Sequence, residues 1–293
     1  MILKNQLKMI ALLSLLLALP TTIFAQAWGY DNNRFAISAD GNNVDDPLDK
    51  WLRADEDDWG ATPAAMAMIA KLNLGDKLVH YSYNNFVEGK PGPDDENMMY
   101  IGVKGGLERF PLNADLFFDC TKRFEEAKES LKAEIAKSTA SDPLYFIHMG
   151  PSEFFYQCVD EVIQEGGIES LSHIYVLSHS GYNDNHIRRP YHHTMTQAIE
   201  LSEGRINYKR IKDQNGKNDP NALWNSLEDF SVWYWMRDSK DPNIRWIYER
   251  MLPNAKGHAD ISDAGMVYYL LVGDVDGSPS KFREFLGESI LSE

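Results

Sequence analysis

Eight carboxylates fall between Asp40 and Asp58, where only Lys50 and Arg53 carry the opposite charge. The run begins directly after RFAIS (34–38), an apolar stretch typical of a strand, and ends just before TPAAMAMIAKL (62–72), which is typical of a helix. Acids placed this closely raise one another's pKa. Either water solvates an acidic loop, or a cation lies among the oxygens. Because carboxylate oxygens are the ligands that calcium and magnesium take, the second explanation makes metal binding the chemistry to test.

The acidic run does not match a standard calcium loop, because DGNNVDDPLDKW lacks the central Gly and terminal Glu of an EF-hand. A distant acid, Asp263, opens the strongly apolar helix predicted from SDAGMVYYLL (262–271). Asp263 could cap that helix, but Ser262 could equally do so and leave Asp263 free. The strand before the run and this second acid favour a cation site over a solvated loop.

Strand-like and helix-like segments alternate along the first two thirds of the chain. Apolar strands are predicted at 34–38, 77–83, 142–151 and 173–180, with a weaker one at 206–211, and helices at 62–74, about 113–138, 152–167 and 192–203. This order predicts an α/β fold with a mostly parallel central sheet and helices on both faces. From Asn221 on, the chain is expected to be almost wholly helical, and its aromatic residues are expected to pack in the core.

Polar residues follow the first four predicted strands. They are Asp40, Asn84-Asn85, the segment 148–153 and Ser178-His179-Ser180. The carboxyl ends of parallel strands lie on one edge of a sheet, where ligands bind. The sequence therefore predicts a site at this edge.

Three segments, in the right order along the chain, resemble the nucleoside hydrolases of the inosine-uridine-preferring type. Asp40-Gly41 with Asp57-Asp58-Trp59-Gly60-Ala61 is similar to that family's N-terminal signature. HMGPSEF (148–154) resembles its Gly-Pro-Leu-Thr-Asn segment, and SDAGMVYYLL resembles its C-terminal His-Asp-x-x-Ala helix start. The resemblance implies a nucleoside-hydrolase-like fold in a single domain, residues 26–293.

The resemblance also implies one bound calcium ion, with Asp40, Asp58 and Asp263 as ligands. Asp40 would in addition be the base that takes a proton from water, and Asp57 would accept hydrogen bonds from sugar hydroxyls. Among the other polar residues near the strand ends, four are expected to contact substrate: Asn84, His148, Glu153 and Asn183.

The chain departs from the family's pattern at several positions. Ser38 stands where the family has its first Asp, and Ser262 stands where it has a His. Extra residues interrupt the acidic loop, so either Asp45-Asp46 or Asp57-Asp58 can serve the metal. Ala61 and the helix that follows favour the second pair.

The family's substrate segment is replaced by SHSGYNDNHIRRPYHHT (178–194). Its histidines do not have a standard zinc spacing. One histidine could act as general acid towards the leaving group, because its pKa lies near neutrality; His186 is the first choice and His179 the second. Arg188 and Arg189 could hold a sulfate or carboxylate of a substrate, although arginines exposed on a surface usually bind nothing.

We therefore expect a calcium-dependent hydrolase of a glycosidic bond in a saccharide or glycoside. The alternatives are a nucleoside N-ribohydrolase and a non-catalytic sugar-binding protein of the same fold. The sequence has no G-x-S-x-G, P-loop or G-x-G-x-x-G motif, so serine hydrolase, NTPase and dinucleotide-binding functions have no support.

The N-terminal residues 1–25 have the parts of a secretory signal peptide: a basic front, an apolar core and a small residue before the expected cleavage. The apolar core is too short for a comfortable membrane anchor. The mature chain is thus expected in the periplasm or outside the cell, starting near Gln26.

The formal net charge of −15 disfavours nucleic acid as a partner; a homo-oligomer remains open. Cys120 and Cys158 could form a disulfide in an oxidising compartment or remain buried thiols.

Overall fold

A six-stranded, all-parallel sheet forms the centre of the protein, with the strand order β3-β2-β1-β4-β5-β6. The computed structural model describes residues 27–41, 44–45, 47–48, 55–215, 224–226, 230–254, 257 and 259–291. The strands are β1 (Arg34–Ala39), β2 (Leu78–Tyr83), β3 (Phe117–Asp119), β4 (Leu144–Met149), β5 (Ile174–Ser178) and β6 (Asn207–Arg210). The predicted α/β class and parallel sheet are confirmed, whereas the predicted signal peptide lies outside the described residues.

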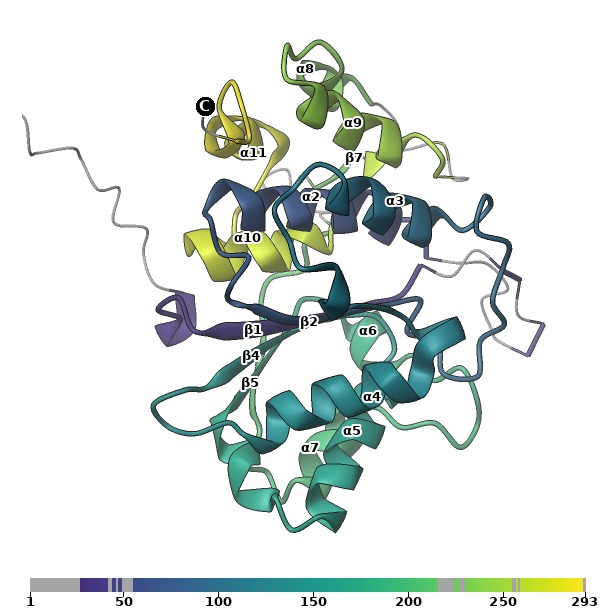
Figure 1. The fold of residues 1–293 in the computed structure, drawn as a ribbon, viewed down its shortest axis with the longest axis vertical. Coiled ribbons are helices and arrows are strands. Elements are labelled where there is room, and N and C mark those ends of the chain that lie inside the picture. Colours follow the sequence, from purple (N-terminus) through teal and green to yellow (C-terminus); the bar gives the residue numbers. More distant parts are fainter. Residues whose placement is uncertain are drawn as a thin grey trace, which may run out of the picture.

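Helices cover both faces of the sheet (Figure 1). On one face lie α2 (Asp58–Lys71), α3 (Met98–Leu107) and α10 (Ala264–Val272), with α8 (Tyr234–Arg237), α9 (Pro242–Met251) and α11 (Pro279–Leu286) stacked beyond them. The other face carries α4 (Cys120–Ala136), α5 (Glu153–Gln164) and α7 (Met195–Leu201), with α6 (Gly181–Asn185) near one end of the strands. The short elements are η1 (Ala27–Gly29), η2 (Ala114–Leu116), η3 (Ile168–His173), η4 (Phe230–Trp233), β7 (Asn225–Ser226) and β8 (Ala259–Asp260).

The central strands are apolar on both faces because both faces are covered. In β1, Phe35 and Ile37 belong to the core under α2 and α10, and Ala36 belongs to the core under α4 and α5. Every residue of β4 is buried. These two apolar layers explain why the strands could be found in the sequence as continuous apolar runs.

The order of the strands places β1 and β4 at the point where the chain reverses its direction of travel across the sheet. Strands β2 and β3 follow on one side of β1, and β4, β5 and β6 on the other. In open parallel sheets, ligands bind beyond the carboxyl ends of the strands at such a switch point. Here the residues at that place are Asp40, which follows β1, and Gly150, which follows β4.

The structure corrects the predicted elements in several places. The segment predicted as one helix over 113–138 contains η2 and the edge strand β3 before α4 begins. Helix α3 had no counterpart in the prediction, because its three glycines lower helix propensity. The C-terminal third contains the antiparallel pair β7–β8 as well as helices.

Most of the C-terminal aromatic residues pack in the core, as predicted. Trp224 and Trp233 are fully buried, and Trp246 is buried too, whereas Tyr234 is partly exposed. Cys120 and Cys158 are both free and buried, so the structure holds thiols and not a disulfide. In the described part of the chain, no helix has the length and apolarity to cross a membrane.

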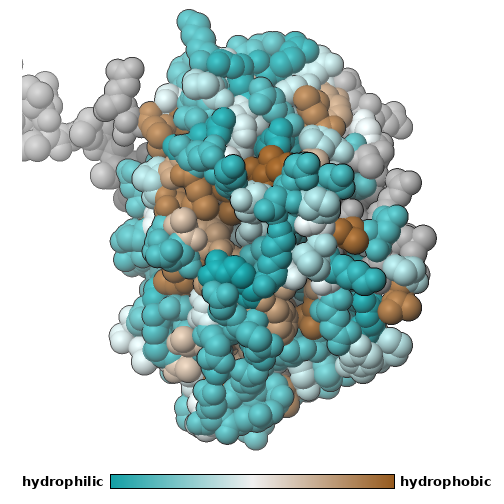
Figure 2. All heavy atoms as spheres, turned by 45° about the vertical axis from the view of Figure 1, so that its right-hand side comes forward, coloured by the Kyte–Doolittle hydropathy of each residue, from teal (hydrophilic) through white to brown (hydrophobic). Residues whose placement is uncertain are grey.

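Figure 2 shows one face of the molecule, which is largely hydrophilic. Hydrophobic residues on this face gather in several groups separated by hydrophilic ones. Exposed apolar residues of this kind are ordinary on a globular protein.

Candidate metal centre

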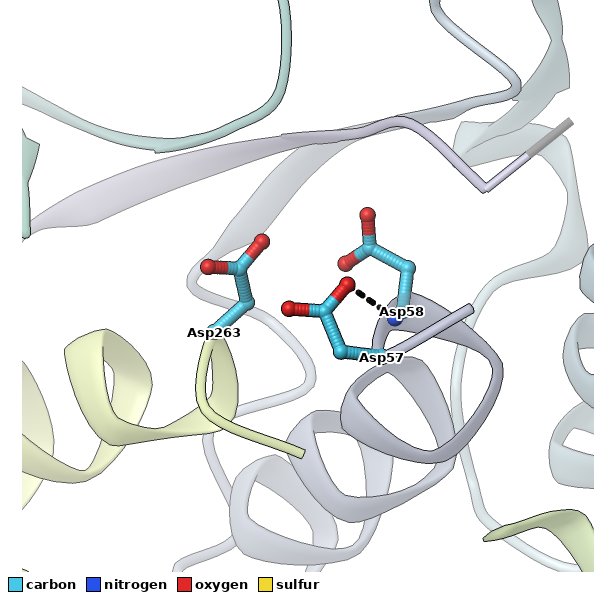
Figure 3. A group of neighbouring side chains, drawn as sticks. All are labelled: Asp57, Asp58 and Asp263. Atoms are coloured by element: carbon cyan, nitrogen blue, oxygen red, sulfur yellow. Dashed lines mark hydrogen bonds between the residues drawn. The ribbon is translucent and has the colours of Figure 1, made fainter. Parts of the chain in front are cut away.

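Three buried carboxylates meet at the starts of two helices. Asp57 and Asp58 open α2, Asp263 precedes α10, and one oxygen from each lies within 4.8 Å of the others. Figure 3 shows these side chains gathered between the two helices. Carboxylates stabilise helix N-termini through the helix dipole, so both helices favour ionised acids at this place. We call Asp57, Asp58 and Asp263 the acidic cluster; it can hold a metal ion.

Close packing brings the two helix starts together. Ser262, just before Asp263, donates a hydrogen bond from Oγ to Asp57 Oδ2 at 3.1 Å. Gly60, in the first turn of α2, allows Ile261 to approach so closely that an added Cβ would lie 2.4 Å from its Cγ2. The side chain of Asp263 makes no cap hydrogen bond to α10 and is directed into the cluster instead. Ser262, at the position of a histidine in the nucleoside hydrolases, therefore links the two acidic segments through this hydrogen bond.

Asp40 lies beside the acidic cluster at the end of β1. Its backbone N–H is within hydrogen-bond distance of Met149 O at 2.9 Å and of Asp58 Oδ2 at 3.0 Å. Gly150 has a φ of +155°, and a Cβ at this position would lie 2.8 Å from the Cβ of Asp40. The loop after β4 thus needs glycine to pass this close to Asp40. The structure places Asp40 next to the cluster; its role as a metal ligand stays a prediction.

Burial strongly perturbs these acids. It raises the pKa of Asp40, Asp57 and Asp58 well above the usual range, and their carboxylate neighbours raise it further. For Asp58 the neighbours are Asp263 and Asp40. A bound divalent cation reverses this effect, because its charge favours the ionised form of every acid around it.

Several buried oxygens near the cluster lack a hydrogen-bond donor. Asp58 Oδ1, Asn84 Oδ1 and Asn85 Oδ1 have no partner among the described residues. Buried polar atoms in native proteins almost always have one, so such atoms call for a specific explanation. Carboxylate and amide oxygens are the donors that calcium takes, and this donor set fits a hard cation.

The two asparagines come from the end of β2. Asn84 has a φ of +50°, donates from its backbone N–H to Asp40 O at 3.2 Å and from Nδ2 to Asn97 Oδ1 at 3.3 Å. Asn85 Nδ2 donates to Ser38 Oγ at 2.9 Å, and Ser38 also accepts from Ser82 Oγ at 2.8 Å. Ser38 stands where the nucleoside hydrolases have an Asp, and it fixes the side chain of Asn85 by accepting its hydrogen bond. The sequence placed both asparagines at the strand end but named only Asn84 as a substrate contact.

His179, at the end of β5, reaches the acidic cluster directly. Its Nε2 bonds to Asp263 Oδ1, and its Nδ1 lies 3.1 Å from the backbone N of Gln214 and 3.4 Å from Asp213 Oδ1. Burial lowers the pKa of His179, but Asp213 and Asp263 more than offset this and raise it to about 9. A pKa of about 9 would protonate both ring nitrogens at neutral pH, whereas the Gln214 N–H needs an unprotonated Nδ1 as its acceptor. The hydrogen bond indicates the neutral ring, and a cation on Asp263 would favour the same state.

His186 is buried at the end of α6 and packs its ring edge-on against Tyr182, with ring centroids 4.5 Å apart.

His148 and Asn183 are brought together: His148 Nε2 lies 3.1 Å from Asn183 O and 3.2 Å from Ser152 Oγ. Burial lowers the pKa of His148. Asp184 opposes this shift, and Asp263 opposes it more weakly.

Glu153 binds another part of the chain. Its Oε2 accepts hydrogen bonds from the backbone N–H of His193 at 2.6 Å and from His193 Nδ1 at 2.9 Å, while Oε1 accepts from Gln157 Nε2 at 2.9 Å. Glu153 thus fastens the segment before α7 to α5. Its expected contact with substrate stays a prediction, and the structure gives it this structural role.

Arg188 and Arg189 are buried, with exposures of 3% and 8%, so they are not the surface arginines that usually bind nothing. The Arg188 guanidinium lies 3.5 Å from the centroid of the Phe86 ring. Its positive charge is close enough to Asp40 to oppose the rise in the pKa of that acid. Nothing in the sequence indicated this burial, because it depends on contacts with the segment after β2, where Phe86 and Glu88 lie.

Of the two candidate Asp pairs, the structure brings Asp57-Asp58 into the acidic cluster. Asp45 is exposed, and Asp46 lies outside the described residues. The preference for Asp57-Asp58 is therefore supported. Asp57, expected as a partner of sugar hydroxyls, lies with Asp58 and Asp263 in the acidic cluster, and its contact with a sugar stays a prediction.

Comparisons with known proteins give one informative likeness. The chain is 26% identical over 259 residues to a protein of Formosa agariphila named "Uncharacterized protein P22", a match that covers 83% of this chain and 85% of that protein. No protein-family model matches the chain, and no solved structure matches it. The resemblance to nucleoside hydrolases is not tested by these comparisons and stays a prediction.

Proposed function

We propose that the protein is a calcium-dependent hydrolase that cleaves a glycosidic bond in a saccharide or glycoside. The observation that carries the proposal is the acidic cluster at the switch point of the sheet, in which Asp58 Oδ1 is buried without a donor. The all-oxygen donor set favours calcium over a softer metal. The resemblance to nucleoside hydrolases adds the reaction class.

The proposed roles follow from position. Asp58 and Asp263 would hold the ion with Asp57 next to them, and a bound calcium ion supplies the charge that lowers the pKa of water and orients it. Asp40 accepts the proton of the attacking water, because its backbone is fixed on β1 and its carboxyl group lies beside the cluster. His179 orients Asp263 through their hydrogen bond. His186 remains the proposed general acid.

A saccharide or glycoside is favoured over a nucleoside for two reasons. The segment 178–194 differs in sequence from the substrate segment of the nucleoside hydrolases, and the N-terminal residues predict export of the chain. The buried Arg188, whose charge acts on Asp40, adds a positive group to this part of the molecule. A nucleoside N-ribohydrolase is the alternative enzyme.

The test is an activity screen of the exported protein on a panel of oligosaccharides and glycosides and on a panel of nucleosides, with calcium or with a chelator. We expect calcium-dependent release of a reducing sugar, and a loss of at least about 100-fold in kcat for Asp40→Asn, since general base catalysis contributes this much. Asp115→Asn, in the exposed η2, is the control that should keep full activity.

Each other outcome identifies an alternative. Release of free base from nucleosides at ordinary enzymatic rates would replace the saccharide proposal with the ribohydrolase. Saccharide binding without turnover in the presence of calcium would make the protein a sugar-binding protein, a reading that Ser38 and Ser262 also permit. Full activity in the chelator would contradict a metal-dependent mechanism.

A further inference from the structure

A cavity with charged residues in its lining lies between α3 and α9, apart from the acidic cluster. Its volume is about 620 Å³, and its lining includes Lys104, Arg109, Trp246 and Arg250 but none of the cluster's three aspartates or Asp40. It shares Asp94, Tyr100, Lys104 and Glu108 with a neighbouring cavity of about 450 Å³, which reaches the ends of β2 and β3. The two cavities thus extend from α9 towards the carboxyl edge of the sheet.

Two arginines line the larger cavity, and neither is held in an ion pair with a described residue. Among the described residues, no carboxylate lies within ion-pair distance of Arg109 or Arg250, and the buried Arg250 Nε has no hydrogen-bond partner. Burial lowers the pKa of Arg250; Glu249 opposes this effect and Arg109 adds to it. Like charges held together in a partly buried place repel each other unless an anion joins them.

The position of Arg109 is fixed by its surroundings. Its Nη1 donates to Gly105 O at 2.9 Å, and its guanidinium carbon lies 4.7 Å from the centroid of the Trp246 ring. Trp246 in turn packs against Gly105, where an added Cβ would lie 2.8 Å from the indole. Arg109 therefore does not need to be ordered when a ligand arrives, and this lowers the entropic cost of binding.

Acidic residues also line the cavity, but they are engaged or lie on its exposed side. Asp94 forms an ion pair with Lys122, and Asp95 and Glu108 are exposed. The half-buried part of the lining is therefore positive, although the whole protein carries a formal charge of −15. These two half-buried arginines therefore differ in sign from the net charge of the protein.

We propose that this cavity binds an oxyanion, such as the sulfate, phosphate or carboxylate group of a ligand, through Arg109 and Arg250, with Lys104 at its rim. The planar guanidinium presents paired N–H donors that match two oxygens of such a group. The proposal does not depend on the metal centre or on the proposed hydrolase activity.

The experiment measures the melting temperature of the full mature chain while sodium sulfate, sodium phosphate or sodium acetate is added, with sodium chloride at equal ionic strength as the reference. We expect a saturable rise with at least one oxyanion beyond the effect of chloride. Calorimetric titration at 20 °C of the same anion into Arg109→Gln and Arg250→Gln should show affinity weaker by about tenfold or more, since each loses a charged hydrogen bond.

Two further variants make the test specific. Arg237→Gln removes an exposed arginine that is paired with Asp238, and it should bind the anion as the wild type does. Asp58→Asn should also leave anion binding unchanged, which separates this site from the metal centre. A wild type that responds to oxyanions no more than to chloride, or equal losses in Arg237→Gln and Arg250→Gln, would overturn the proposal.

Discussion

At the scale of single residues, Asp58 shows the conflict that the metal centre has to resolve. Its side chain is fully buried, one of its oxygens has no donor, and Asp263 and Asp40 raise its pKa beyond the effect of burial. Without a cation, this carboxylate has to take up a proton or remain charged at a cost in stability. With a cation, the same arrangement becomes favourable.

We predict that Asp58→Asn removes most of the stabilisation that calcium gives the wild type. Without calcium, the variant should melt at the same temperature as the wild type or higher, because one buried charge is removed while the amide keeps the wild-type shape. With free calcium at 100 times its dissociation constant, the wild type should gain about 2.7 kcal/mol, and the variant should gain much less. Melting curves with and without a chelator measure both effects, with Asp115→Asn as the control. A wild type that is indifferent to calcium would refute the assignment of the site.

His80 gives a prediction about pH. It is fully buried on β2 between the rings of Phe118 and Phe154, with ring centroids 5.3 and 6.0 Å from its own, and its Nδ1 pairs with Ser130 Oγ at 3.0 Å. Burial lowers its pKa to about 3. A histidine whose pKa is lowered by folding stabilises the fold above its unfolded pKa of about 6.5, and this stability is lost as the pH falls towards 3.

The measurement is urea unfolding of the wild type and of His80→Phe at pH 7 and pH 5. Between these two values the wild type should lose about 2 kcal/mol more than the variant, because only its unfolded state takes up a proton on residue 80. Other titrating groups affect both proteins equally. Equal losses in the two proteins would show that His80 titrates in the folded state much as it does in the unfolded one.

At the scale of elements, the geometry of the metal centre depends on how closely α2 approaches the segment before α10. Gly60 makes this approach possible, since an added Cβ would lie 2.4 Å from Ile261 Cγ2 and 2.9 Å from Met251 Cγ. Gly102 in α3 is a matched contrast: its Cβ would meet Pro63 Cγ at an ordinary 3.5 Å.

Gly60→Ala and Gly102→Ala should therefore change stability in opposite directions. Gly60→Ala forces the two segments apart and should destabilise the protein by about 1–3 kcal/mol. Gly102→Ala should stabilise it by about 0.5–1 kcal/mol, because alanine favours the helix and no neighbour has to move. Denaturant unfolding measures both, and calcium affinity should weaken only in Gly60→Ala. A stabilised Gly60→Ala would mean that the contact between α2 and α10 is looser than the structure shows.

At the scale of the whole molecule, the two candidate sites lie in regions of opposite character. The acidic cluster lies at the switch point between β1 and β4, under the helices that begin at Asp58 and Ala264. The arginine-lined cavity lies farther out, between α3 and α9. A strongly acidic chain attracts cations over much of its surface, so the proposed oxyanion site depends on the local contacts of Arg109 and Arg250 and not on the charge of the whole molecule.

Much of the architecture could be predicted from the sequence because its signals are local. Apolar runs such as those of β1 and β4 reveal strands buried on both faces, and polar residues after them mark the carboxyl edge of the sheet. Strand β3 escaped prediction because three residues are too few to show a periodicity. The start of α2 was placed four residues too late, at Thr62, because Pro63 is typical of a helix beginning and lies here inside the helix.

By itself, then, the sequence determined the α/β class, the polar residues at the carboxyl edge of the sheet, and two of the three acids that could hold a cation, Asp58 and Asp263. Tertiary structure alone decided that Asp57 joins Asp58 and Asp263, that His179 is bonded to Asp263, and that Arg188 is buried within electrostatic reach of Asp40. The reason is that these contacts join distant parts of the chain: Ser262 and Asp57, for example, are 205 residues apart. Residue types and spacing specify which elements form, whereas the packing of one element on another fixes which side chains meet.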